Sequence, residues 1–134
     1  MKTLPQIITL TTLLFTLTSF AVAGSIRWHN YSSSVFSQAK KQRKTVMLFA
    51  MSDTCHWCQE MIDTTFRNAA VTRTINRYFY PVMLHADRDR RSFKQLGLIG
   101  IPTIVFFNRS GNAKGTYEGY LKTSVMLRRL SEMR

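Results

Sequence analysis

The sequence predicts an α/β domain with a central mixed sheet and helices on both of its faces. Short continuous apolar runs, typical of strands covered on both faces, alternate with segments whose apolar residues recur every three or four positions, as in helices. The chain has 134 residues, which is enough for one domain but not for a second core. Hydrophobic residues make up 45% and charged residues 19%, so the composition excludes disordered and collagen-like chains.

The first half of the predicted domain alternates helix, strand and helix. Apolar residues at helical spacing, followed by a run of cations, predict a helix over about 33–42. The continuous apolar run 45–50 predicts a central strand. Apolar residues in steps of three and four then predict one or two helices from the cysteines to about Arg77.

The second half begins with another strand and a helix and continues into a hairpin. Residues 79–86 are again short and apolar, which predicts a strand, and a charged helix follows near 89–96. A turn at 108–111 separates a strand at 103–107 from its hairpin partner at 112–118. The first two strands are joined through a helix and should be parallel, whereas the last two should be antiparallel.

A last helix is expected to begin with Thr123 as its cap. Its helical spacing predicts a set of core-facing residues, namely Val125, Met126, Leu127, Leu130 and Met133. With this helix, the predicted elements cover both faces of the sheet.

Residues 1–23 resemble a secretory signal peptide and are set apart from the domain at 24–134. Lys2 is followed by the uncharged stretch 7–20, in which eight of fourteen residues are Ile, Leu or Phe, and then by an Ala-x-Ala pattern that ends at Ala23. An uncleaved membrane anchor is the alternative, although the stretch is shorter than the roughly 20 apolar residues of a spanning helix. Cleavage near Ala23 would place the domain in the periplasm or outside the cell, where conditions are oxidising.

The chain is strongly basic, with 19 Lys and Arg against 7 Asp and Glu and a formal net charge of +12. The cations gather at Lys40 to Lys44, at Arg67, Arg73 and Arg77, and at Arg88, Arg90 and Arg91. Solvated faces that keep the protein soluble are one explanation, and a weak contact with an anionic membrane surface or an acidic partner is the other. No aromatic-interleaved motif indicates nucleic acid binding, and we expect a monomer.

The two cysteines stand three residues apart as Cys55-His56-Trp57-Cys58, where the predicted strand 45–50 gives way to a helix. Cys55 is therefore expected at the helix N-terminus, where free backbone N–H groups and the helix dipole favour a thiolate over a thiol. Cys58 follows one helical turn later, within reach of Cys55, so it can attack a mixed disulfide formed there. This arrangement predicts a cycle of thiol exchange.

Other roles for the two cysteines have less support. A permanent structural disulfide across so short a loop would restrict the unfolded chain little. A zinc site needs four ligands, and besides the cysteines only His29, His56 and His85 are available, without the spacing of a zinc motif. Covalent haem attachment would need a histidine where Gln59 stands. We therefore expect no metal and no cofactor other than the redox-active cysteine pair.

Together with Gly100-Ile101-Pro102-Thr103, the cysteine motif resembles the thioredoxin superfamily. The likeness covers about residues 27–133 and is nearest to a small secreted thioredoxin-like branch, the thioredoxin_7 type. A CxxC motif after a buried strand, with Ile-Pro-Thr before another strand about 45 residues later, is a specific combination. Further features shared with this branch are Trp28, Ala39-Lys40 and Gly119-Tyr120.

The resemblance implies a thioredoxin fold and disulfide exchange, with Cys55 as nucleophile and Cys58 as resolving thiol. It also implies a cis peptide bond at Ile101-Pro102 that faces the disulfide, so that these two residues meet the substrate backbone. A trans proline at the first residue of a strand is the alternative. Trp57 is either a platform that faces the substrate or a part of the local packing.

The sequence also departs from the usual thioredoxin pattern. Phe49 stands where the family places a buried acid, so the resolving thiol lacks its usual proton acceptor, for which Asp53, Glu60 or water could substitute. His56 follows the nucleophile. If protonated, it would lower the pKa of Cys55, whereas a solvent-facing ring would have little influence.

These observations predict a secreted or periplasmic thiol–disulfide oxidoreductase that exchanges the Cys55–Cys58 pair with the thiols or disulfides of protein substrates. A redox partner would recycle the dithiol. The runner-up is a noncatalytic binding module that keeps the disulfide as structure and binds a partner through its basic surface.

Overall fold

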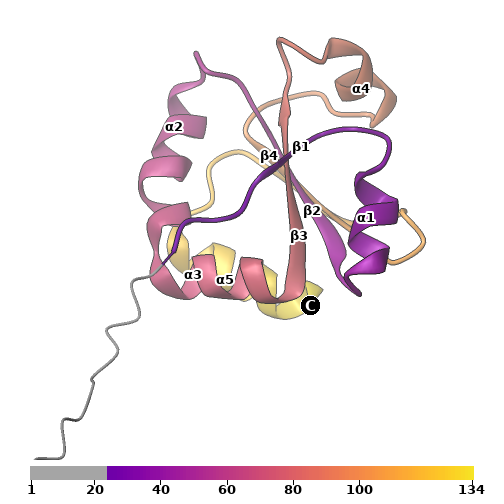
Figure 1. The fold of residues 1–134 in the computed structure, drawn as a ribbon. Coiled ribbons are helices and arrows are strands. Elements are labelled where there is room, and N and C mark those ends of the chain that lie inside the picture. Colours follow the sequence, from indigo (N-terminus) through magenta and orange to yellow (C-terminus); the bar gives the residue numbers. More distant parts are fainter. Residues whose placement is uncertain (1–23) are drawn as a thin grey trace, which may run out of the picture.

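A five-stranded sheet forms the centre of the computed structural model, which describes residues 24–134 (Figure 1). The predicted signal peptide at 1–23 lies outside the described residues. The strands are β1 (His29–Asn30), β2 (Thr45–Met51), β3 (Phe79–His85), β4 (Thr103–Phe107) and β5 (Ala113–Glu118). The helices are α1 (Val35–Lys41), α2 (His56–Asp63), α3 (Ala69–Tyr78), α4 (Arg90–Gln95) and α5 (Thr123–Met133), with a 3-10 turn at Thr65–Arg67.

The strand order is β1-β3-β2-β4-β5, which places β2 at the centre as predicted. β2 pairs in parallel with β3 and antiparallel with β4, and β4 and β5 form the predicted antiparallel hairpin. The mixed sheet that the sequence indicated is therefore confirmed. The edge strand β1 was not predicted, because a pair of residues is too short to show an alternating pattern.

Helices cover both faces of the sheet, and the side chains of β2 divide between two clusters accordingly. The odd-numbered residues from Met47 to Met51 pack with residues of α2, α3 and α5. The even-numbered residues from Val46 to Ala50 pack with residues of α1. Since successive side chains of a strand point to opposite faces, the continuous apolar run reflects burial on both sides. Within residues 24–134, no helix has both the length and the apolar character required to cross a membrane.

The start of α5 differs from the prediction. Thr123 is the first residue of the helix rather than its cap, and Lys122, whose backbone is extended, takes the cap position without a side-chain hydrogen bond. Of the residues of α5 that were predicted to face the core, Met126 and Leu130 are fully buried. The neighbouring Leu127 is only half-buried, because α5 lies at the edge of the core and covers it with a narrow stripe.

The start of α3, in contrast, has a side-chain cap. The Oδ1 atom of Asn68 accepts hydrogen bonds from the backbone N–H groups of Ala70 at 3.0 Å and Val71 at 3.2 Å. These bonds satisfy two of the backbone donors that a helix leaves free at its N-terminus. Asn68 thus fixes the point where the chain turns into α3.

Replacing this cap should destabilise the fold. The Asn68→Ala variant loses both hydrogen bonds, so we expect the free energy of unfolding to fall by about 1 kcal/mol. Asn68→Asp keeps an acceptor oxygen at the same place and serves as the control, with stability close to that of the wild type. Urea unfolding followed by circular dichroism measures both. An alanine variant as stable as the control would show that the cap contributes nothing.

Candidate functional site

The two cysteines form a disulfide where β2 ends and α2 begins. Cys55 is the N-cap of α2, and its Sγ atom accepts a hydrogen bond from the backbone N–H of Cys58 at 3.2 Å. Cys55 is half-buried, whereas the side chain of Cys58 is fully buried in the core cluster. Of the two cysteines, Cys55 is therefore the more exposed.

The environment of Cys55 favours negative charge on its sulfur. The backbone donor from Cys58 points at the sulfur, and the first turn of α2 contains no acidic residue that would oppose an anion. A hydrogen bond to the charged form of a group stabilises that form, and the positive end of the helix dipole acts in the same direction. In the dithiol state, the same geometry would stabilise a thiolate at Cys55.

Ile101 and Pro102 lie at the same end of the sheet as the disulfide. Pro102 directly precedes β4, which pairs with β2 next to the strand end that leads to Cys55. The peptide bond between Ile101 and Pro102 is cis, as the resemblance implied. Ile101 and Cys55 both pack against the core cluster that contains Cys58. The backbone oxygen of Pro102 accepts a hydrogen bond from the N–H of Gly119 at 2.8 Å, which ties this loop to the end of β5.

Exposed apolar side chains accompany the disulfide. Trp57, which follows Cys55 by two residues, is 56% exposed, and its ring lies 5.5 Å from that of Tyr120. Ile99, two residues before Ile101, is 83% exposed. Ile99 was not among the predicted site residues, although its place directly before the Gly-Ile-Pro-Thr motif was an available signal. Both motifs thus carry or adjoin exposed apolar side chains.

His56 is the first residue of α2 and is exposed. Its ring stands edge-on to that of Trp57, with 5.2 Å between the ring centroids. One imidazole ring and one indole ring thus meet edge to face on the solvent side of the motif. Trp57 packs locally against His56 and Tyr120, and more than half of it is exposed.

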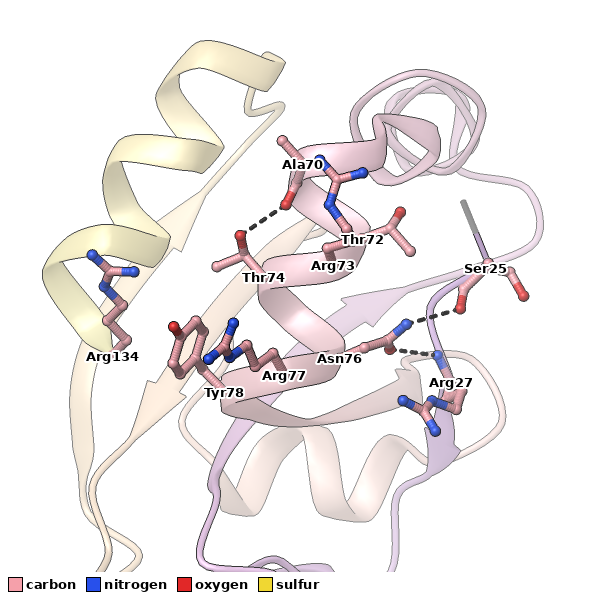
Figure 2. A pocket seen from close by; sticks show the side chains of 11 residues that line it. Ser25, Arg27, Ala70, Thr72, Arg73, Thr74, Asn76, Arg77, Tyr78 and Arg134 are labelled. Atoms are coloured by element: carbon pink, nitrogen blue, oxygen red, sulfur yellow. Dashed lines mark hydrogen bonds between the residues drawn. The ribbon is translucent and has the colours of Figure 1, made fainter. Parts of the chain in front are cut away.

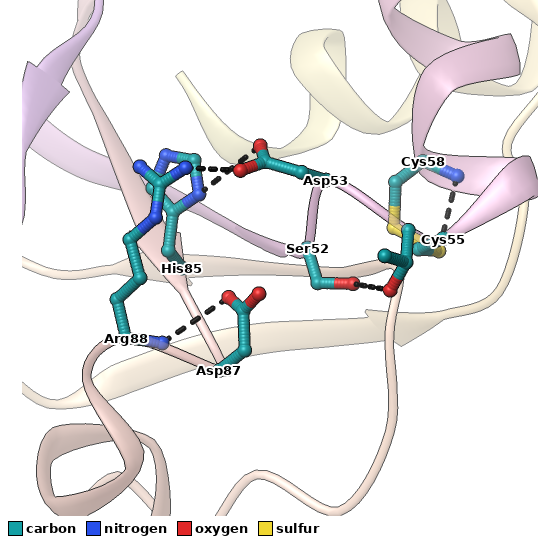
Figure 3. Close-up of polar contacts among 8 residues, drawn as sticks. Ser52, Asp53, Cys55, Cys58, His85, Asp87 and Arg88 are labelled. Carbon is teal, nitrogen blue, oxygen red and sulfur yellow. Dashed lines mark hydrogen bonds and ion pairs between the residues drawn. A yellow bond between two sulfur atoms is a disulfide. The ribbon is translucent and has the colours of Figure 1, made fainter.

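Asp53, one of the candidate proton acceptors for Cys58, is engaged elsewhere. Its carboxylate forms an ion pair with Arg88, and its Oδ1 atom lies 3.6 Å from Nδ1 of His85. Figure 3 shows the carboxylate turned toward these two residues and away from the disulfide. Sequence reasoning did not find His85 and Arg88 as partners, because more than thirty residues separate them from Asp53 and only the parallel pairing of β2 and β3 brings them together.

Aromatic rings surround position 49, where the usual thioredoxin pattern has a buried acid. Phe49 is fully buried, and its ring lies 5.0 Å from that of Phe66 and 5.8 Å from that of Trp28. No carboxylate therefore reaches Cys58 from this position. Across residues 24–134, no three His, Cys, Asp or Glu side chains are grouped as metal ligands would be.

Known proteins share both the sequence features and the fold. The family model Thioredox_DsbH, described as "Protein of unknown function, DUF255", matches residues 17–95. Spermatogenesis-associated protein 20 of Mus musculus is 35% identical over 66 residues, which are 49% of this chain and 8% of that protein. Thiol:disulfide interchange protein DsbD of Vibrio cholerae is 34% identical over 84 residues, which are 58% of this chain and 14% of that protein.

Among solved structures, a thioredoxin from Thermus thermophilus superimposes with a TM-score of 0.72 at 23% identity, covering 81% of this chain and 87% of that one. The thioredoxin fold is therefore confirmed. The chain corresponds to only a small part of the two curated relatives named above. Because the family model matches more than half of its residues, the chain belongs to the Thioredox_DsbH family of the thioredoxin superfamily.

Proposed function

We propose that this chain is a thiol–disulfide oxidoreductase that exchanges its Cys55–Cys58 pair with the thiols or disulfides of protein substrates. The observation that carries the proposal is the asymmetry of the pair: Cys55 is partly exposed and accepts a hydrogen bond from a backbone N–H, and Cys58 is fully buried one turn later. The similarity to a thiol:disulfide interchange protein supports the same chemistry.

In the direction of substrate reduction, the cycle starts from the dithiol. The Cys55 thiolate attacks one sulfur of a substrate disulfide, forms a mixed disulfide and releases the other substrate sulfur as a thiolate. The Cys58 thiolate then attacks Sγ of Cys55, which restores the internal disulfide and releases the second substrate thiol. The substrate gains two electrons and the protein loses two, so a separate dithiol partner must reduce Cys55–Cys58 before the next turn. Oxidation of a substrate dithiol runs through the same steps in reverse.

The surroundings of the disulfide suit a protein substrate. Trp57 and Tyr120 form an exposed aromatic pair beside Cys55, and apolar side chains of an extended or unfolded chain can pack on it. Ile101 and Pro102 are far from the CxxC motif in the sequence but lie at the same end of the sheet. We assign them to contact the substrate backbone. Substrate recognition is then apolar and tolerant of sequence.

We also propose that the protein works in the periplasm or outside the cell, after cleavage near Ala23. The support is the pattern of residues 1–23, with one cation, an uncharged apolar stretch and an Ala-x-Ala end. N-terminal sequencing of the protein recovered from the periplasm or the medium tests this placement, and a first residue at Met1 would contradict it.

Reduction of insulin in the presence of a dithiol reductant tests the activity itself. The wild type should accelerate insulin reduction and Cys55→Ser should not. If neither protein accelerates it, the noncatalytic binding module becomes the better interpretation. The equilibrium with glutathione then assigns the direction, since a reduction potential of about −270 mV is typical of a reductase and one of about −120 mV of an oxidant.

The two cysteines should differ when substrates are trapped. In Cys58→Ser, the exposed Cys55 still attacks a substrate, but no resolving thiol follows, so mixed disulfides accumulate. In Cys55→Ser, the remaining thiol is fully buried and should trap nothing. Nonreducing electrophoresis with a disulfide-containing protein substrate shows the adducts. Equal trapping by the two variants would contradict the roles assigned here.

The reactivity of Cys55 should depend on pH in a defined direction. Because the start of α2 stabilises the thiolate, the pKa of Cys55 in the dithiol form should lie below the reference value of about 8.5. The rate of alkylation should then rise with pH up to that lowered pKa and stay level above it. Alkylation of Cys58→Ser, followed from acid to alkaline pH, gives the midpoint, and a midpoint at or above the reference value would remove the activation argument.

Replacement of Trp57 should weaken the binding of protein substrates but not the reaction with small disulfides. Trp57→Ala removes most of the exposed aromatic surface, so we expect KM for insulin to rise several-fold while the rate with a small disulfide reagent stays unchanged. Tyr78→Ala is the matched control, because Tyr78 is an exposed aromatic residue at the end of α3, away from the disulfide. A similar rise in KM for both variants would mean that the effect is not local to the site.

A further inference from the structure

A hollow of about 850 Å³ lies along the exposed face of α3 (Figure 2). Gly24 and Ser25 border it on one side and the end of α5 on the other. Among the residues that line it are the four arginines that define what we call the arginine pocket, namely Arg27, Arg73, Arg77 and Arg134. No acidic side chain of the described residues lines it.

The arginine pocket lies at the opposite end of the domain from the disulfide. α3 leads directly into the first residue of β3, Phe79, whereas Cys55 follows the last residues of β2, which pair with the end of β3 at His85. Seven strand residues separate the two ends, which corresponds to about 20 Å. Figure 1 shows α3 and α5 across one end of the sheet and the start of α2 at the other.

Acidic residues are distributed unevenly between these two ends. Residues 69–78 and 123–134 contain five arginines and one acid, Glu132, whose carboxylate is already paired with Arg129 at 3.0 Å. Among the described residues, no ion pair involves an arginine of the pocket. The other six acidic residues lie on α2, on the loops at the disulfide end and at the end of β5, and they are Asp53, Glu60, Asp63, Asp87, Asp89 and Glu118.

The pocket brings cations together without a counterion. The ring of Tyr78 lies between the guanidinium groups of Arg77, at 5.3 Å from the ring centroid, and Arg134, at 5.4 Å (Figure 2). Two like charges on one ring repel each other, and an anion between or beside them would relieve the repulsion. The planar fork of a guanidinium group matches the oxygens of a phosphate, to which it can bind with two parallel hydrogen bonds.

We propose that the arginine pocket docks the domain on the phosphate headgroups of an anionic phospholipid bilayer. The chain enters the domain at Gly24, on the rim of the pocket, and this position favours a bilayer over an acidic protein as the partner. Asn76 fixes that place, since its Nδ2 donates to the backbone oxygen of Ser25 at 3.1 Å and its Oδ1 accepts from the N–H of Arg27 at 3.0 Å. The uncharged apolar stretch 7–20 ends four residues before Gly24, within about 14 Å of the pocket along an extended chain.

A bilayer therefore suits both neighbouring features of this surface. Before cleavage, the apolar stretch can enter the hydrocarbon layer while the arginines meet the headgroups, and an exposed tyrosine among arginines is typical of residues at a membrane interface. After cleavage near Ala23, the new ammonium group of Gly24 would add a further positive charge to the rim of the pocket. In this orientation the disulfide faces away from the bilayer and stays open to substrates.

Vesicle binding of the full chain tests the proposal. Vesicles of phosphatidylcholine alone are compared with vesicles that also contain phosphatidylglycerol, and every variant keeps the apolar stretch, so that its contribution cancels. The test variant is Arg73→Gln with Arg77→Gln. The control is Arg90→Gln with Arg91→Gln, which removes the same charge from exposed positions on α4, away from the pocket.

The wild type should prefer the anionic vesicles, and added salt should weaken this preference. Each arginine near an anionic surface contributes about fivefold to binding, so the test variant should bind the anionic vesicles about 30-fold more weakly. The affinity of the control variant should fall less than threefold. All three proteins should bind neutral vesicles equally and reduce insulin at the same rate, so that a failure of docking is distinguished from a failure of exchange activity.

Three results would overturn the proposal. Equal losses from the two variants would mean that only the overall charge acts. No preference for anionic vesicles would mean that the arginines do not bind the headgroups. Binding of polyglutamate that depends on Arg73 and Arg77, without such dependence for vesicles, would assign the pocket to an acidic protein instead.

Discussion

The structure depends on the burial of β2, which pairs with β3 on one edge and β4 on the other while helices cover both of its faces. A buried strand must have its backbone N–H and C=O groups paired, and both neighbours supply these bonds. Its register cannot slip by one residue, because each side chain would then move from one cluster to the other. The strand end is thereby held in one place, and the turn to Cys55 begins there.

The disulfide end is built from loops that follow several strands and are tied together by long-range contacts. The N–H of Ala86 donates to the oxygen of Met51 at 2.8 Å, and the pairing of Asp53 with Arg88 joins the same two loops through their side chains. The hydrogen bond from the N–H of Gly119 to the oxygen of Pro102 ties the end of the β4–β5 hairpin to the loop before β4. At the other end, helices α3 and α5 place arginines with few acids, so the length of the sheet separates the exchange chemistry from the arginine pocket.

Most elements were predictable because each has a strong local cause. The run 45–50 is too apolar and too short for anything but a buried strand, and the spacing of apolar residues marks α3 and α5 clearly. The errors fall where local causes are weak. The pairing of β1 depends on its neighbour β3 rather than on its own two residues, and Thr123 has the chemistry of a cap, but the extended backbone of Lys122 occupies that position.

The sequence by itself determined the fold class and the place of Cys55 at a helix start, because spacing along one chain carries that information, and its resemblance to a family implied that Ile101-Pro102 faces the CxxC motif. Only the tertiary structure decided how these parts meet. It turned Asp53 toward Arg88 and His85, surrounded Phe49 with aromatic rings, and gathered Arg27, Arg73, Arg77 and Arg134 around one hollow. Such contacts join residues that are far apart in the chain, so they depend on strand pairing and helix packing, which no local pattern encodes.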